Sequence, residues 1–281
     1  MLTFIISMRA RALARDWGYH TWLLQNTLNS ILAQTNPEFN VVVACHDLPE
    51  IPQIKNAAVH MLRVDFPPPR RDNDDMCVDK VLKISRGVEW AMANGSNYVM
   101  YVDADDLVSR RLSEFVAAHS GENGWYFLSG YNYRYGERRM YRHMPHHLIC
   151  GTGAIVRTNL LRFERIDLYR GENVETLAAA GIANYRSHLA AQGAPIKPLP
   201  FPGAIYVLHD DSTSEVPSGT GYRLGGTNIP RPLWRRVLSW GKKTAIRVQK
   251  MHFITPSLRR QYSVPYPNQI PLEYRPRDVL F

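Results

Sequence analysis

The sequence is poor in cysteine and has no long apolar run. Its 281 residues include three cysteines, Cys45, Cys77 and Cys150, and none forms a CxxC pair. This usage excludes a disulfide framework and a thiolate zinc site, and it is typical of reduced thiols in a cytosolic protein. No stretch approaches about 18 consecutive apolar residues, and the opening MLTFIISM is too short for a signal-peptide core. We therefore expect a cytoplasmic protein that is soluble, or peripheral at the inner membrane face.

Acidic residues are missing from one long segment. There is no Asp or Glu between Val216 and Leu272, while the same segment holds ten Lys and Arg residues. The net charge of +9 belongs to this segment, because the rest of the chain is nearly neutral. If the protein binds a polyanionic partner, we therefore expect the C-terminal tail alone to bind it.

Short apolar runs alternate with helical patterns along the first hundred residues. We expect strands at 2–7, 40–44, 59–66 and 98–102, and helices at 20–34 and 78–92. Near-continuous apolar strands connected in this way predict an α/β fold, with a mostly parallel sheet covered by helices on both faces. The less regular second half predicts helices at 112–118 and 174–191, a strand at 125–129, a hairpin at 131–142 turning at Gly136, and apolar runs at 154–156, 196–199 and 204–208.

Polar clusters follow three of the expected strands. They are Ser7–Arg11, Cys45–Asp47 and Asp103–Asp106. Ligands of open α/β sheets bind outside the carboxyl ends of the strands, so these clusters are the first candidates for a site.

The sequence Asp103-Ala104-Asp105-Asp106 places three carboxylates in one turn after a strand. Like charges this close repel one another, so the turn requires a cation or a raised pKa. Carboxylate oxygens suit Mg²⁺ or Mn²⁺, which binds through one or two carboxylates together with substrate phosphates. The alternative is an acidic turn that caps the next helix, with Asp106 or Ser109 as the cap.

The first 110 or so residues resemble the GT-A glycosyltransferases, in particular the family-2-like group. The resemblance is carried by LTFIIS, TLNSILAQT, NVVVACHD and DKVLKISRGVEWAMANGSNYVMYVDADD. It implies a GT-A-type, Rossmann-like fold with a smaller mixed region on the acceptor side. The expected divisions are a nucleotide-sugar-binding half at 1–106, an acceptor-side half at 107–211, a flexible loop at 212–230 and a basic amphipathic extension at 231–281.

The resemblance also implies the residues that hold the donor. The implied nucleotide-sugar contacts are Ser7, Arg9, Arg11, Asp47, Lys80, Lys83 and Asp103. The implied ligands of a divalent Mn or Mg ion are Asp103, Asp105, Asp106 and His209. Arg9 and Arg11 stand where the family usually has a Pro-x-Tyr-Asn-like turn. Solvated arginines, surface lysines and an ordinary strand-end histidine are the alternatives for these positions.

The implied reaction moves a glycosyl group from a nucleoside diphosphate sugar, with UDP expected, to a hydroxyl of a glycan, lipid-linked or envelope acceptor. In this family the carboxylate that takes the acceptor proton belongs to an acidic pair at the start of a helix in the second half, and the usual Glu-Asp pair is missing here. Glu172 is the first candidate, followed by Glu175 and Asp167, and the alternative is that these residues cap or solvate a helix. The histidines of RHMPHH fit no zinc pattern, and we expect an acceptor-side or surface role for them.

The tail and two other functions complete the hypotheses. Residues 233–253 form a basic amphipathic pattern that suits either an anionic membrane surface or packing on the catalytic domain. Nucleic-acid binding is not expected, because the sequence has no motif that recognises DNA or RNA. One alternative function is a DxD phosphatase of the haloacid dehalogenase type, although Leu107 occupies a position that normally holds Thr or Val. The other is a non-catalytic adaptor that binds a membrane or polyanion through the tail.

Overall fold

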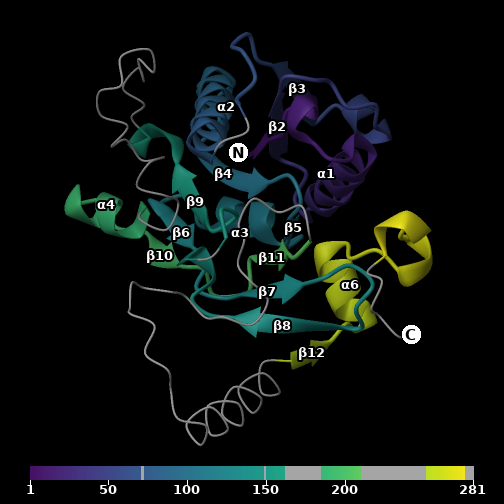
Figure 1. The fold of residues 1–281 in the computed structure, drawn as a ribbon. Coiled ribbons are helices and arrows are strands. Elements are labelled where there is room, and N and C mark those ends of the chain that lie inside the picture. Colours follow the sequence, from purple (N-terminus) through teal and green to yellow (C-terminus); the bar gives the residue numbers. More distant parts are fainter. Residues whose placement is uncertain (71–72, 149, 162–184, 210–250, 276–281) are drawn as a thin grey trace, which may run out of the picture.

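The computed structural model describes residues 1–70, 73–148, 150–161, 185–209 and 251–275 (Figure 1). The described strands form two sheets, of seven and five strands. The first has the order β10-β6-β9-β4-β1-β2-β3. Its strands are β1 (Leu2–Ser7), β2 (Phe39–Cys45), β3 (Val59–Arg63), β4 (Tyr98–Asp103), β6 (Gly124–Tyr126), β9 (Ala154–Arg157) and β10 (Lys197–Pro198).

The first sheet is built around β1. Strand β1 pairs in parallel with β2 and with β4, and β2 pairs in parallel with β3. Strand β9 runs antiparallel to β4 and β6. Although β6, β9 and β10 come from beyond residue 106, they extend this sheet. The predicted α/β class is confirmed.

Helices pack on both faces of the first sheet. They are α1 (Trp17–Leu32), α2 (Asn73–Ala93), α3 (Leu112–Ala118) and α4 (Tyr185–Ala191). The side chains of Phe4 and Ile6 share one buried cluster with α1 and α3, whereas Ile5 shares another with α2 and α4. This division follows from the alternation of side chains along a strand. Helix α2 approaches β1 closely because residue 87 is glycine, since a β-carbon there would overlap Ile5.

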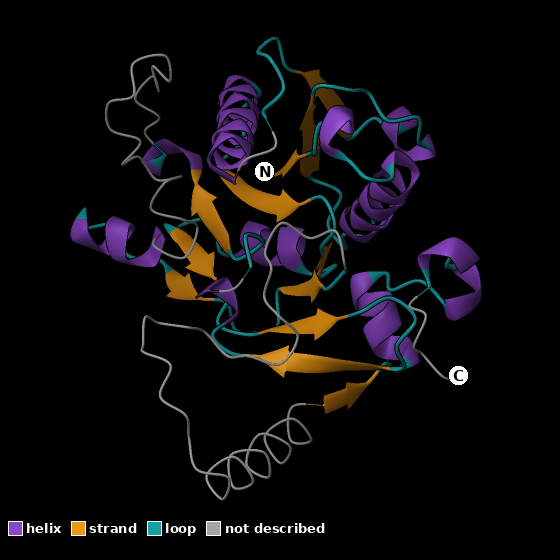
Figure 2. Ribbon diagram, in the orientation of Figure 1, coloured by secondary structure: helices purple, strands orange, loops and turns teal. Residues whose placement is uncertain are grey.

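The second sheet has the order β12-β8-β7-β11-β5 (Figure 2). Its strands are β5 (Leu107–Val108), β7 (Gly130–Tyr133), β8 (Arg139–His143), β11 (Ala204–Val207) and β12 (Met251–Phe253). Strands β7 and β8 form the predicted antiparallel hairpin. Helix α6 (Pro256–Tyr262) places Tyr262 in a buried cluster with Leu23 of α1, Tyr131 and Ile205. This cluster joins the C-terminal segment to the body of the protein.

The C-terminal segment differs from its prediction. Met251–Phe253, expected as the end of a helix over 233–253, is strand β12 and pairs antiparallel with Arg139–Tyr141 of β8. The edge of β8 gives these residues backbone partners, which outweighs a helical pattern of side chains. The rest of that pattern, 233–250, lies outside the described residues, as do the expected loop at 212–230 and most of the expected helix at 174–191. Within the described ranges, no helix combines the length and apolar character that crossing a membrane requires.

Candidate functional site

Three strand ends bring the predicted polar clusters to one edge of the first sheet. In the register of the sheet, Ser7 at the end of β1 pairs with Asp103 of β4 on one side and with Ala44 of β2 on the other. The turn after β4 and the turn after β2 therefore flank the end of β1. This is the carboxyl edge at which parallel α/β sheets bind ligands.

Asp103 is held by contacts from two other elements. Its backbone N–H donates to the Thr152 hydroxyl at 2.9 Å, and its carboxylate forms an ion pair with Lys80 of α2. Burial disfavours the charge on Lys80, but Asp103 and then Asp105 outweigh burial, so the pKa of Lys80 lies above its ordinary value. A lysine that stays charged at this edge provides a positive group beside the carboxylates.

Asp105 is paired with His209, which follows β11. The two side chains meet at 2.7 Å between Asp105 Oδ2 and His209 Nε2. Burial alone would raise the pKa of Asp105, but His209, with a smaller effect of Lys80, outweighs burial and holds this pKa below its ordinary value. The buried Nδ1 of His209 has no hydrogen-bond partner among the described residues. The structure thus brings together two residues that are 104 positions apart.

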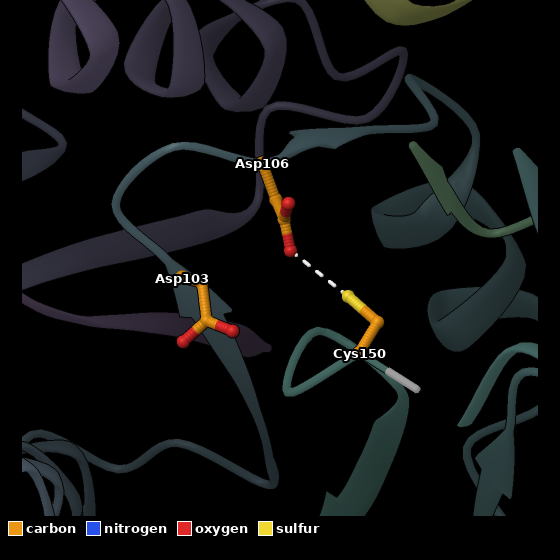
Figure 3. A group of neighbouring side chains, drawn as sticks. All are labelled: Asp103, Asp106 and Cys150. Carbon is orange, nitrogen blue, oxygen red and sulfur yellow. Dashed lines mark hydrogen bonds between the residues drawn. The ribbon is translucent and has the colours of Figure 1, made fainter. Parts of the chain in front are cut away.

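Asp106 points into the interior (Figure 3). Its carboxylate accepts hydrogen bonds from the Cys150 thiol at 2.9 Å, the Thr152 hydroxyl at 2.5 Å and the Val207 N–H at 3.1 Å. Burial raises the pKa of Asp106 well above its ordinary value, and the charges of Asp105 and Asp103 raise it further. Burial and the nearby Asp106 also raise the pKa of the Cys150 thiol. Asp106 therefore ties the acidic turn to two other parts of the chain.

The acidic turn and Cys150 could hold a metal ion. One ligand atom from each of Asp103, Asp106 and Cys150 lies within 4.8 Å of the others. The thiol is the poorest ligand of the three, because its raised pKa keeps it protonated and hard cations prefer oxygen. The carboxylate oxygens of this group are ligands that fit Mg²⁺ or Mn²⁺. His209 is not part of the group, and its Nε2 is bonded to Asp105.

Lys83 is not a surface lysine, because its side chain is fully buried. Its ammonium donates to Asp79 at 2.7 Å and to the carbonyl of Met8 at 2.8 Å, just after β1. The other oxygen of Asp79 lies 2.7 Å from His46 Nε2. Burial lowers the pKa of Lys83, and Asp79 opposes that effect. This network fixes the turn after β1 to the turn after β2 and to α2.

The remaining predicted donor contacts lie in the same turns. Asp47 accepts a hydrogen bond from the Arg11 N–H at 2.8 Å, which connects the end of β2 to the short helix at Arg11–Leu13. Ser7 and Arg9 are half-buried, and Arg11 is exposed. Glu172, Glu175 and Asp167, the candidates for a catalytic base, lie outside the described residues.

Comparisons with known proteins give structural neighbours but no family. No family model and no curated protein match the chain. S. aureus TarS is 13% identical, with a TM-score of 0.44, over 74% of this chain and 36% of that one. Residues 1–349 of S. aureus TarS give 14% identity and a TM-score of 0.43, and the same fragment in complex with UDP gives 14% and 0.41. The chain spans 60% of that fragment.

Sequence reasoning missed two residues of this region, Thr152 and Tyr135. Thr152 contacts both Asp103 and Asp106. The only feature of the sequence that could have indicated it is the pair of glycines that flank it in Gly151-Thr152-Gly153. The Tyr135 hydroxyl is buried and has no partner among the described residues. Burial raises the pKa of Tyr135 well above its ordinary value, and the nearby Asp105 and Asp106 contribute to this rise.

Proposed function

We propose that the chain is a metal-dependent glycosyltransferase of the GT-A type. It moves a sugar from a nucleoside diphosphate sugar, a UDP-sugar in the first instance, to a hydroxyl of a glycan, lipid-linked or envelope acceptor. The observation that carries the proposal is the position of the DxDD turn. It follows β4 at the edge formed by β1, β2 and β4, and its Asp105 pairs with His209.

Each residue of this edge has a role in the proposal. Asp103 and Asp105 hold the divalent ion, with His209 as a further ligand. The buried Asp106 orients the turn through its hydrogen bond with Cys150. The ion stabilises the charge that develops on the departing diphosphate. Lys80 adds a positive charge on the same side.

The turns after β1 and β2 receive the nucleoside. Ser7 and Asp47 lie toward the base, and Arg9 or Arg11 takes the place of the family's usual turn. Lys83 acts indirectly, because its ammonium holds the Met8 carbonyl and does not reach the surface. The base that deprotonates the acceptor is proposed among Glu172, Glu175 and Asp167.

The phosphatase alternative is not favoured by the topology. In that class the DxD motif follows the strand that opens the fold, whereas Asp103 follows β4, after β1, β2 and β3 have formed. Three further points belong to the proposal. The chain divides into its two halves at residue 106, the tail contacts a membrane peripherally, and the protein is cytoplasmic.

A screen of nucleotide-sugars by thermal denaturation tests the function. The full chain is heated with UDP-, GDP-, ADP- and dTDP-sugars, each with Mn²⁺, with Mg²⁺ or with a chelator. We expect at least one donor to raise the melting temperature in the presence of metal and to lose this effect in the chelator, because ligand binding stabilises the folded state. The absence of a metal-dependent shift with every donor would contradict the proposal.

A further inference from the structure

A groove of about 490 Å³ lies between α1 and the C-terminal segment that begins at α6. One wall carries Trp22, Gln25 and Asn29 of α1, and the other carries Arg259 and Arg260 of α6 together with the chain that follows, as far as Gln269. The groove shares no lining residue with the acidic turn. Figure 1 shows α6 in yellow beside α1 and the second sheet. The groove is therefore a concave surface separate from the acidic turn.

The groove is positively charged. None of its lining residues is acidic, and it contains two arginines. Arg259 is fixed in place, since its Nη1 donates to the Pro265 carbonyl at 2.6 Å and its guanidinium lies 4.7 Å from the centre of the Tyr266 ring. Arg260 is exposed and forms no ion pair with any described residue. An unpaired guanidinium in a concave surface is suited to a carboxylate or a phosphate.

Amide donors stand beside these arginines. The side-chain oxygen of Asn29 accepts from Gln53 at 2.9 Å, and that of Gln269 accepts from the Tyr266 N–H at 2.8 Å. In both side chains the acceptor end is used, and the NH₂ group has no partner in the described part of the chain. Gln25 likewise makes no hydrogen bond there. These groups suit a ligand with several hydroxyl or ether oxygens.

Aromatic rings complete the surface and connect it to the candidate site. Tyr266 is 53% exposed, so the ring face that Arg259 does not cover is available for a sugar to stack on. Trp22 is half-buried and packs against Tyr19, Tyr135 and Tyr274. Trp22 stacks on Tyr19 with ring centres 6.0 Å apart, and Tyr19 contacts the ring of His209 at 5.7 Å. Trp22, a lining residue of the groove, is thus one aromatic residue away from the histidine that pairs with Asp105.

We propose that this groove binds an oxyanion-bearing glycan, a hydroxyl-rich chain with carboxylate or phosphate groups. The oxyanion pairs with Arg260, the amides bind the sugar oxygens, and Tyr266 stacks on a sugar ring. Its binding is independent of the donor. That this glycan is also the acceptor of the transfer rests on the proposed function and on the contacts that connect Trp22 through Tyr19 to His209.

Calorimetric titration of the full chain tests the groove. The probes are trigalacturonic acid, a phosphorylated maltotriose, neutral maltotriose and inorganic phosphate. We expect one or both charged trisaccharides to bind at least tenfold more tightly than neutral maltotriose and inorganic phosphate. Arg260→Gln should weaken the charged probe about tenfold, which is about 1.4 kcal/mol, because a charge-assisted hydrogen bond to the oxyanion is lost. Tyr266→Ala should weaken both the charged and the neutral trisaccharide.

A matched control separates the groove from general attraction to a basic protein. Arg138→Gln removes the same charge from an exposed arginine outside the groove and should leave the affinity unchanged. Equal weakening by Arg138→Gln and Arg260→Gln would overturn the proposal. So would inorganic phosphate binding as tightly as the charged trisaccharides, because the site would then be an ion site only.

Titration with UDP and Mn²⁺ keeps this result distinct from the proposed function. Arg260→Gln should bind UDP as the wild type does. If the wild type binds the charged trisaccharide but neither UDP nor any nucleotide-sugar of the screen, the proposed function fails while the groove stands. If UDP binds and no trisaccharide does, only the groove is overturned.

Discussion

Gly151 lies so close to the Asp103 carboxylate that no β-carbon fits between them. Gly151→Ala should therefore displace this carboxylate and weaken binding of the nucleotide-sugar and metal at least tenfold. The melting temperature of the unliganded protein should change little, because the displaced group is the end of a flexible side chain. Titration with UDP and Mn²⁺, together with thermal denaturation, measures both effects.

Gly121→Ala is the control for this change. A β-carbon at Gly121 would meet no atom within 4 Å, so its binding should match the wild type. Wild-type affinity in Gly151→Ala would remove Asp103 from the site.

The buried network of Lys83, Asp79 and His46 predicts a large loss of stability on truncation. Lys83→Met leaves the carboxylate of Asp79 buried without its ammonium partner, which costs about 3 kcal/mol. Lys197→Met breaks an ion pair between the exposed Lys197 and the half-buried Glu122, and should cost below about 1 kcal/mol. Urea denaturation of the two variants gives the comparison. Equal losses would show that Lys83 does not hold this network together.

His146 predicts acid sensitivity of the fold. Its side chain is buried, neither ring nitrogen has a partner among the described residues, and burial, with repulsion by His143 and His147, lowers its pKa to about 3. The unfolded chain binds this proton below about pH 6.5, whereas the folded chain does not. Stability is therefore retained above pH 6.5 and is lost as the pH falls toward 3, by at most about 1.4 kcal/mol per pH unit.

The His146→Leu variant tests this dependence. It should lose stability less steeply between pH 6.5 and pH 4 than the wild type, as measured by urea denaturation at each pH. His119→Gln changes an exposed histidine and should keep the wild-type slope. Parallel curves for the wild type and His146→Leu would contradict the assignment.

Local patterns were sufficient for the elements that form from contiguous residues. Strand β1 and helix α3 have the predicted bounds, because an unbroken apolar run and a short helical spacing each lead to one structure. Helix α1 begins at Trp17, earlier than the apolar spacing indicated, because Asp16 accepts a hydrogen bond from the Tyr19 N–H and caps the helix.

Contacts between distant parts of the chain were beyond these patterns. The spacing of Asp79 and Lys83 does place them on one helix face, but the carbonyl of Met8 that completes their network comes from another element. In the same way, the buried carboxylate of Asp106 accepts hydrogen bonds from Cys150 and Thr152, which come from another part of the chain. No short segment of sequence contains that information.

Metal binding by Asp105 is the most direct test of the central claim. Mn²⁺ is titrated calorimetrically in the presence of UDP into the wild type, into Asp105→Asn and into Asp65→Asn, a control at an exposed aspartate. We predict that the wild type and Asp65→Asn bind the ion with equal affinity, and that Asp105→Asn binds it at least tenfold more weakly. Unchanged Mn²⁺ affinity in Asp105→Asn, or no binding by the wild type, would contradict the claim that the turn at 103–106 holds the metal.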